Sequence, residues 1–267
     1  SLFTVQTAEK GVYWFKLKLR GKPGHASMPG AGDNAVVKAA RSVERIVSTK
    51  PPIKVTPHAR IFIENLLDMV GKKWVSKLLL NPYIADHALK RIPDKSHAVF
   101  IEAMLRNTLT PTVVRGGEKE NIVPSDCELT VDCRLLPGYD EEWIKKYLRQ
   151  LLKDLDYELE FLQREPPSES PTDTPLYTAI EKALYELLPG SKATPFMVMG
   201  GTDSRYFRWK FESVAYGFFP IRGDLPLKEF LAMIHGVNER ISIRNIEFSY
   251  RTLVKTIEEF YKLVKPK

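Results

Sequence analysis

Two glycines and a histidine near the C-terminal end are the first residues whose types and spacing suggest chemistry. Gly200, Gly201 and Thr202 leave an apolar run, and glycine lets backbone N–H groups approach a ligand closely. His235 follows in the sequence His-x-x-x-Glu-Arg, where a neutral imidazole can hold a metal. Alone, each signal is weak, because a single histidine is more often satisfied by a backbone group. The two segments therefore indicate a binding site only in combination with other residues.

A second histidine, His25, lies in a turn between an expected strand and an expected helix. Gly24 precedes it, and Ser27 and Pro29 follow it. Loops that connect regular elements often carry function. The residues alone leave a catalytic role and a structural role equally open. For the remaining histidines, which are His58, His87 and His97, we expect surface or structural roles.

Asn121 and Arg134 complete the set of candidate residues. Asn121 precedes Ile-Val-Pro, and Arg134 lies in the alternating run 125–135, which predicts a strand. The apolar face of this strand carries Cys127 and Cys133, and Arg134 lies on the polar face. A solvated face would explain Arg134 without any function.

Taken in order, the motifs around His25, Asn121, Gly200 and His235 resemble the C-terminal portion of the M20 family of zinc amidohydrolases. This family includes aminoacylases, acetylornithine deacetylases, succinyl-diaminopimelate desuccinylases and carboxypeptidases of the Gly-X type. The resemblance covers essentially the whole chain. It is greatest to the carboxypeptidase and aminoacylase branch.

The resemblance implies a role for each candidate residue. His25 would be the lid histidine that enters the active site of the partner subunit and stabilises the oxyanion of amide hydrolysis. Asn121 would donate to the substrate carbonyl. Arg134 would bind the substrate carboxylate, which suits a guanidinium fork.

The C-terminal motifs would complete that site. Gly200, Gly201 and Thr202 would add backbone N–H groups on the carboxylate side, and Asp203 and Arg205 would position this loop through ion pairs. His235 would be a ligand of the second of two zinc ions. The other ligands of the family and its general base precede the region that begins at Ser1, so the zinc site is incomplete in this chain. We therefore expect a fragment that is inactive by itself.

The order of expected elements predicts an α/β (α+β) fold with two parts. A strand at 12–20, a helix capped by Asp33 or Asn34, strands at 111–115 and 125–135, a helix capped by Asp140 and a strand at 157–161 follow the ferredoxin-like βαββαβ plan. This plan is expected of an M20 lid domain, which we place at residues 12–164. A further strand near Arg60–Glu64 and a helical insertion at about 66–106 interrupt it.

Residues 1–11 and 165–267 are expected to form part of an α/β zinc-hydrolase catalytic domain. The proline-rich run 164–175 predicts the boundary between the two parts. After this run the pattern favours a helix at 176–187, strands at 196–199 and 214–218, and a final helix at about 243–263. Two strands suggest only part of a larger sheet.

Composition restricts the classes of partner. The 267 residues carry a net charge of +7, but their basic and acidic side chains are interspersed, which does not favour nucleic-acid binding. No apolar run is long enough for a membrane helix, so we expect no membrane partner. Cys127 and Cys133 are too far apart on one strand to bridge, which favours buried thiols and a cytoplasmic setting.

Three functions are compatible with these residues. The first is the lid and C-terminal catalytic part of a homodimeric metallohydrolase acting on an N-acyl amino acid or short peptide. The second is a non-catalytic dimerisation module. The third is RNA binding through the ferredoxin-like sheet. The sequence favours it least, because it lacks the aromatic stacking pattern that such modules use.

Overall fold

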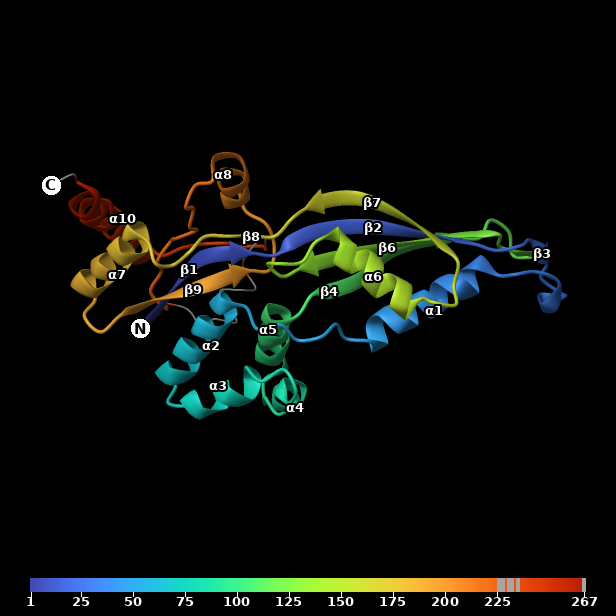
Figure 1. Cartoon of the computed structure of the whole chain (residues 1–267), viewed down its shortest axis with the longest axis horizontal. Helices are drawn as coiled ribbons and strands as arrows, with labels where there is room; N and C mark the ends of the chain where they lie inside the picture. The colour runs from blue at the N-terminus through green and yellow to red at the C-terminus, as the bar shows by residue number, and fades with distance from the viewer. Residues whose placement is uncertain (225–228, 230–232, 234–235, 266–267) are drawn as a thin grey trace.

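Two β-sheets follow one another along the long axis of the molecule (Figure 1). The computed structural model describes residues 1–224, 229, 233 and 236–265. A four-stranded sheet forms one end, and a three-stranded sheet forms the other. The chain crosses directly from one sheet to the other between β1 (Leu2–Glu9) and β2 (Gly11–Arg20). Much of the candidate site lies around this junction.

The four-stranded sheet has the ferredoxin-like plan predicted from the sequence. Its strands are ordered β4-β6-β2-β7, and every neighbouring pair is antiparallel. The bounds of β4, β6 and β7 are Thr108–Gly116, Asp126–Leu135 and Tyr157–Glu165. Two helices, α1 (Ala35–Ser48) and α6 (Glu141–Leu151), connect the strands. The alternation of apolar and polar residues therefore predicted both central strands.

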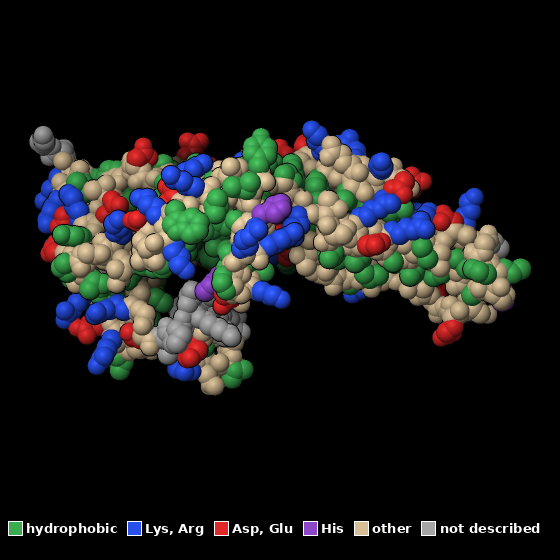
Figure 2. Space-filling model, turned by 90° about the horizontal axis from the view of Figure 1, so that it is seen from below, with side chains coloured by type: hydrophobic (Ala, Val, Ile, Leu, Met, Phe, Trp, Pro, Cys, Tyr) green, Lys and Arg blue, Asp and Glu red, His purple; other side chains and the backbone are tan. Residues whose placement is uncertain are grey.

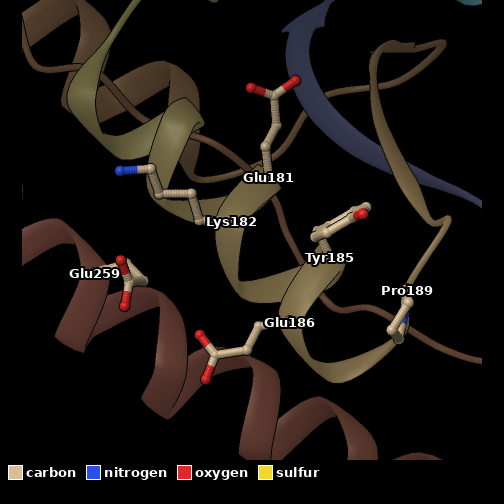
Figure 3. A pocket seen from close by; sticks show the side chains of 6 residues that line it. All are labelled: Glu181, Lys182, Tyr185, Glu186, Pro189 and Glu259. Atoms are coloured by element: carbon tan, nitrogen blue, oxygen red, sulfur yellow. The ribbon is translucent and has the colours of Figure 1, made fainter.

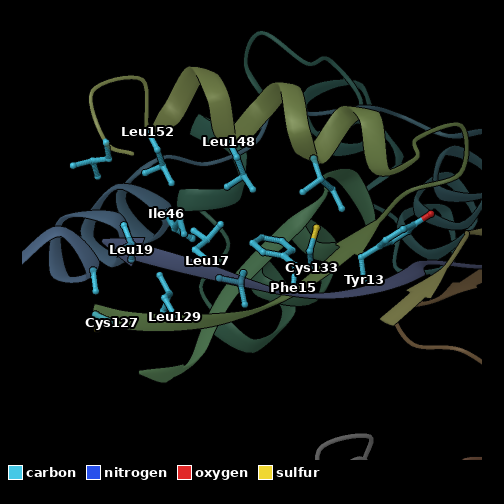
Figure 4. Close-up of a cluster of buried hydrophobic side chains, with 14 of the residues drawn as sticks. Tyr13, Phe15, Leu17, Leu19, Ile46, Cys127, Leu129, Cys133, Leu148 and Leu152 are labelled. Atoms are coloured by element: carbon cyan, nitrogen blue, oxygen red, sulfur yellow. The ribbon is translucent and has the colours of Figure 1, made fainter. Parts of the chain in front are cut away.

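The core of this part lies between the sheet and its two helices (Figure 4). Phe15, Leu17 and Leu19 of β2 are fully buried there, and so are the thiols of Cys127 and Cys133. Asn34 begins α1 by accepting hydrogen bonds from two backbone N–H groups of the first turn, as one of the two predicted caps. The prediction of buried, unbridged cysteines is confirmed.

Four helices occupy the segment between α1 and β4: α2 (Pro57–Met69), α3 (Lys73–Leu79), α4 (Ala85–Lys90) and α5 (Lys95–Leu105). The predicted strand near Arg60–Glu64 is wrong, because these residues belong to α2. Thr56 caps this helix by accepting a hydrogen bond from Ala59, and Pro57 occupies its first turn. The helices therefore begin earlier than the predicted position 66. They pack their apolar side chains against Ala8 and Met197 of the three-stranded sheet.

The three-stranded sheet has the order β8-β1-β9, with β8 at Ser168–Glu169 and β9 at Lys192–Val198. Strand β1 was not predicted. The predicted strand at 214–218 is wrong, since only Gly217 forms an isolated bridge, to Gln6. The backbone carbonyl of Ala215 accepts hydrogen bonds from the side chains of Arg208 and Ser170 instead of from a neighbouring strand.

Three described helices accompany this sheet: α7 (Pro175–Leu187), α8 (Ser204–Phe211) and α10 (Ile243–Val264). Helices α7 and α10 lie side by side at the end of the molecule that carries both termini (Figure 1). Across the described ranges, none of the helices has the length and apolar character needed to cross a membrane.

Candidate active site

The first group of candidate residues lies at the tip of the four-stranded sheet. A small ribbon there joins β3 (Gly24–His25) to β5 (Ile122–Val123), and the short helix η1 (Pro29–Ala31) follows it. The backbone N–H of Ala26 donates to the carbonyl of Asn121 at 3.0 Å. The structure thus brings His25 and Asn121 together, although they are far apart in the sequence. Both residues are exposed.

The hydrogen bonds of His25 determine which ring nitrogen carries the proton of the neutral imidazole. The backbone N–H of Ser27 donates to Nδ1 at 3.2 Å, and the Ser27 hydroxyl lies 2.8 Å from the same atom. Because Nδ1 accepts a hydrogen bond from an N–H group, the proton of the neutral ring is on Nε2. His25 therefore presents an N–H donor at the exposed tip of the sheet.

The second group lies at the opposite end of the same sheet, around Arg134. The guanidinium donates through Nε and Nη2 to the two oxygens of Asp132, at 2.6 and 2.8 Å. The indole of Trp14 also donates to Asp132, at 3.1 Å. These contacts hold the plane of the guanidinium and leave its third nitrogen, Nη1, directed toward the glycine loop. A methyl group added at Gly200 would lie 3.8 Å from this atom.

The loop Gly200–Thr202 is held in place by two buried charged residues, Glu9 and Arg205. The backbone N–H of Thr202 donates to the carboxylate of Glu9, so this donor is already used within the protein. The guanidinium of Arg205, which is 2% exposed, packs directly against Gly201, where any side-chain carbon would overlap it. Arg205 pairs with Glu165 and Glu9. Asp203 is exposed and forms no ion pair within the described ranges.

Glu9 is the residue of this site that the sequence did not reveal. It is 1% exposed, and its other oxygen accepts from Arg208 at 2.8 Å and from Ser168 at 3.2 Å. One carboxylate therefore joins the glycine loop, helix α8 and strand β8. A buried carboxylate with so many donors is a positioning element of the loop. The only signal in the sequence is two adjacent charges, Glu9 at the end of β1 and Lys10 directly after it.

Lys10 is the second charged residue buried at the junction. Its Nζ donates to the carbonyls of Ala103 and Arg106, at 2.9 and 2.8 Å, and so ties the end of α5 to the junction of the two sheets. Burial lowers the pKa of Lys10 from 10.5 to about 7. The junction therefore combines buried charges of both signs.

The remaining histidines have the structural or surface positions expected of them. His58 is buried and bridges β1 and β8, with Nδ1 2.8 Å from the Thr7 hydroxyl and Nε2 3.1 Å from Glu169. The hydrogen bond from His58 lowers the pKa of Glu169. His87 and His97 are exposed on α4 and α5.

The predicted zinc ligand His235 lies outside the described residues. Among the residues that are described, no three His, Cys, Asp or Glu side chains are grouped so that they could hold a metal. The donor set in this part of the chain therefore does not fit a zinc centre.

The two groups of candidate residues are separated by the length of a strand. Arg134 pairs with Val12 at one end of β6, and Asp126 pairs with Arg20 at the other end, next to the ribbon that carries His25. Eight residue steps on a strand span about 27 Å. One copy of the chain therefore cannot place His25 and Arg134 on the same small molecule.

A hollow of the described surface lies elsewhere. It has a volume of about 690 Å³ and lies between α7 and α10, where Glu181, Lys182, Tyr185 and Glu259 line it (Figure 3). None of the candidate residues contributes to it.

Residues 7–160 match the family model described as the peptidase dimerisation domain of M20 enzymes. An N-fatty-acyl-amino acid synthase/hydrolase, PM20D1 of Xenopus tropicalis, is 28% identical over 95% of this chain and 49% of its own length. A probable carboxypeptidase S-like protein of Dictyostelium discoideum is 23% identical over 96% of the chain and 49% of its own length.

Solved structures show the same fold. The M20 metallo-carboxypeptidase Sso-CP2 of Sulfolobus solfataricus superposes with a TM-score of 0.61 at 18% identity, over 98% of this chain and 60% of that structure. The chain spans about half the length of the curated relatives that it matches. Because the family model covers more than half of its residues, the chain belongs to the M20 peptidase family.

Proposed function

We propose that this chain is the substrate-recognising and lid-bearing part of a hydrolase that cleaves an amide bond next to a free carboxylate. The single observation that carries the proposal is the position of the Arg134 guanidinium beside the Gly200–Thr202 loop. An arginine held in one plane, next to glycines whose backbone is accessible, is suited to a carboxylate. An N-acyl amino acid or a short peptide has this carboxylate one residue from its amide bond.

Within this site, Asp132 positions Arg134, and the substrate carboxylate would bind at Nη1. The backbone N–H groups of Gly200 and Gly201 would add hydrogen bonds, while that of Thr202 serves Glu9. The relatives support the same class of substrate, since their names describe N-fatty-acyl-amino acid hydrolysis and carboxypeptidase activity. The two descriptions share an amide bond and a neighbouring carboxylate.

At the other end of the sheet, His25 and Asn121 would act on the reacting carbonyl. The Nε2–H of His25 would donate to the oxygen that becomes negative as the tetrahedral intermediate forms. Asn121 would donate to the carbonyl of the bound substrate. Since about 27 Å separate them from Arg134, they would act on a substrate held by a second copy of the chain.

A homodimer through the lid would bring the second copy into place. Within the described residues, β4 pairs with β6 alone, so its outer edge presents unpaired backbone groups. Val113 and Val114 on β4 and Val47 on α1 are exposed. An edge strand with exposed valines suits antiparallel pairing with its counterpart in another copy. The match to a dimerisation domain supports this assembly.

The zinc ions of the intact enzyme would polarise the carbonyl and activate water. Apart from His235, which we propose as a ligand, their binding would depend on further ligands, and the described residues group no such set. The chain alone would therefore be inactive. The two buried thiols support a reducing, cytoplasmic setting.

Calorimetric titration of the chain with an N-acyl amino acid tests the proposed carboxylate site. The matched ligand is the corresponding carboxamide, and the matched variant is Arg134→Met. We expect the carboxylate ligand to bind at least about tenfold more tightly than the carboxamide, because a hydrogen bond to a charged group contributes about 1.5–3 kcal/mol. Arg134→Met should abolish this preference. Equal binding of both ligands by the native chain would contradict the proposal.

A non-catalytic dimerisation module is the second candidate function. The match of residues 7–160 to the dimerisation domain favours it, because that segment includes the whole four-stranded sheet apart from the last residues of β7. Such a module would form dimers in sedimentation experiments but would not distinguish the carboxylate from the carboxamide.

A further inference from the structure

The turn between α2 and α3 exposes an unusual run of apolar side chains. Met69, Val70, Trp74 and Leu78 are all exposed within ten residues of sequence, and Trp74 has 66% of its surface in contact with solvent. Helix α3 buries Ser76 and Leu79 against its neighbours. Trp74 and Leu78 are four residues apart, so they share the outer face of the helix. This apolar face of α3 is therefore turned away from the protein.

Three lysines surround these apolar side chains. Lys72, Lys73 and Lys77 are exposed, and of the three only Lys73 has an acidic partner among the described residues, Asp68 at 3.7 Å. Figure 2 looks at the side of the molecule from which the helices α2–α5 project and shows apolar and basic side chains interleaved there. The segment 69–78 thus combines exposed apolar groups with an excess of positive charge.

The apolar face of α10 has a different character. Ile246 and Ile257 are also exposed, but the basic residues Arg251, Lys255 and Lys262 each pair with a glutamate at 2.6–2.7 Å. Their charges are largely balanced. Of these two apolar surfaces, only the one at 69–78 offers an excess of positive charge to a partner.

We propose that the segment 69–78 docks on a lipid surface that contains anionic headgroups. Tryptophan and leucine side chains would enter the boundary between headgroups and acyl chains, and the lysines would remain at the level of the phosphates. Each basic residue near an anionic surface strengthens binding. The proposed contact requires no membrane-crossing helix, and it is an alternative to the expectation of no membrane partner, which considered only spanning segments.

This docking would serve an enzyme whose substrate is itself amphiphilic, because such a substrate partitions into the membrane. The inference does not depend on the proposed hydrolase function. If the chain binds vesicles but does not prefer the carboxylate ligand, the docking surface is supported and the proposed carboxylate site is contradicted. If it prefers the carboxylate ligand but does not bind vesicles, the carboxylate site is supported and the docking surface is contradicted.

Co-sedimentation with vesicles tests the proposal. One set contains phosphatidylcholine alone, and a second contains about one third phosphatidylserine, at a salt concentration of about 0.1 M. We expect the native chain to bind the anionic vesicles and to dissociate as salt increases. The double variant Lys72→Gln/Lys77→Gln should bind about thirtyfold more weakly. Trp74→Ser should reduce binding about tenfold, because it removes an inserted aromatic side chain.

Matched controls separate this surface from the rest of the molecule. The double variant Ile246→Ser/Ile257→Ser on α10 should bind vesicles as the native chain does. Circular dichroism should show that all variants fold, since the substituted side chains are exposed. Equal binding to both kinds of vesicle, native binding by the lysine variant, or loss of binding only in the α10 variant would overturn the proposal.

Discussion

At the scale of single residues, the junction between β1 and β2 carries charges that the protein interior tolerates only in combination. Glu9 accepts hydrogen bonds from Thr202, Arg208 and Ser168 while almost fully buried, and burial lowers the pKa of Arg208. Removing one charged partner of such a buried network leaves the remaining charged side chains desolvated and unpaired. The position of the glycine loop thus depends on a residue that touches no substrate.

Glu9→Gln is therefore expected to destabilise the fold by about 3–5 kcal/mol, because Arg205 and Arg208 lose a buried counter-charge. Urea unfolding measures this loss. The control is Glu160→Gln, whose carboxylate pairs with Lys18 at 2.8 Å on the surface. It should leave the free energy of unfolding nearly unchanged, because an exposed ion pair contributes little to stability. Similar losses in both variants would show that the Glu9 network does not stabilise the junction.

Lys10 gives the stability of the protein a dependence on pH. Its pKa is about 7 in the folded state and 10.5 as an ordinary lysine, so between these values the unfolded chain binds a proton that the folded chain does not. The free energy of unfolding therefore rises with pH, by at most about 1.4 kcal/mol per unit. Denaturation of native protein and of Lys10→Met at pH 7 and pH 9 should show this rise only in the native protein. A parallel rise in both would exclude Lys10 as its source.

The sequence indicated most of the candidate residues, but it did not indicate the buried contacts that position them. His25, Asn121 and Arg134 belong to local motifs, and a motif can be read from neighbours in the chain. The partners of Glu9 come from residues 168–208, and no local pattern distinguishes a buried carboxylate from a solvated one. The packing of Arg205 against Gly201 is likewise a property of the fold.

At the scale of elements, the loop 200–202 depends on a glycine that has no room for a side chain. Gly201→Ala would place a methyl group on the buried guanidinium of Arg205 and should cost about 1–3 kcal/mol. Gly30→Ala is the matched control, since nothing lies within 4 Å of the added carbon, and its effect should remain within about 0.5 kcal/mol. Thermal unfolding of both variants measures the difference. Equal melting temperatures would contradict the described packing.

Elements with a clear apolar period were predictable, and those stabilised by distant partners were not. Strand β6 alternates throughout and β2 alternates from Tyr13 onward, so their faces were identified correctly. The segment at 60–64 reads as a strand by composition, but the cap at Thr56 and the burial of Phe62 and Ile63 against the three-stranded sheet favour a helix. Strand β1 pairs with β9, which lies far along the chain, and was missed.

At the scale of the whole molecule, we propose that two copies of the chain form each reaction site. His25 and Arg134 lie at opposite ends of one sheet, about 27 Å apart by strand length, and β4 offers an edge for pairing. In such a dimer, each site would take Arg134 from one copy and His25 from the other. Each site would then need residues from both copies, whereas independent sites would each use residues of a single copy.

Mixing two inactive variants tests this proposal most directly, in a zinc-loaded protein that joins this chain to the metal-binding half of an M20 enzyme. His25→Ala and Arg134→Met should each lack hydrolysis of an N-acyl amino acid. In a mixed dimer, however, one of the two sites would combine the intact His25 of one subunit with the intact Arg134 of the other. An equal mixture that exchanges subunits should therefore regain about a quarter of the native rate. A mixture no more active than either variant alone would contradict the account.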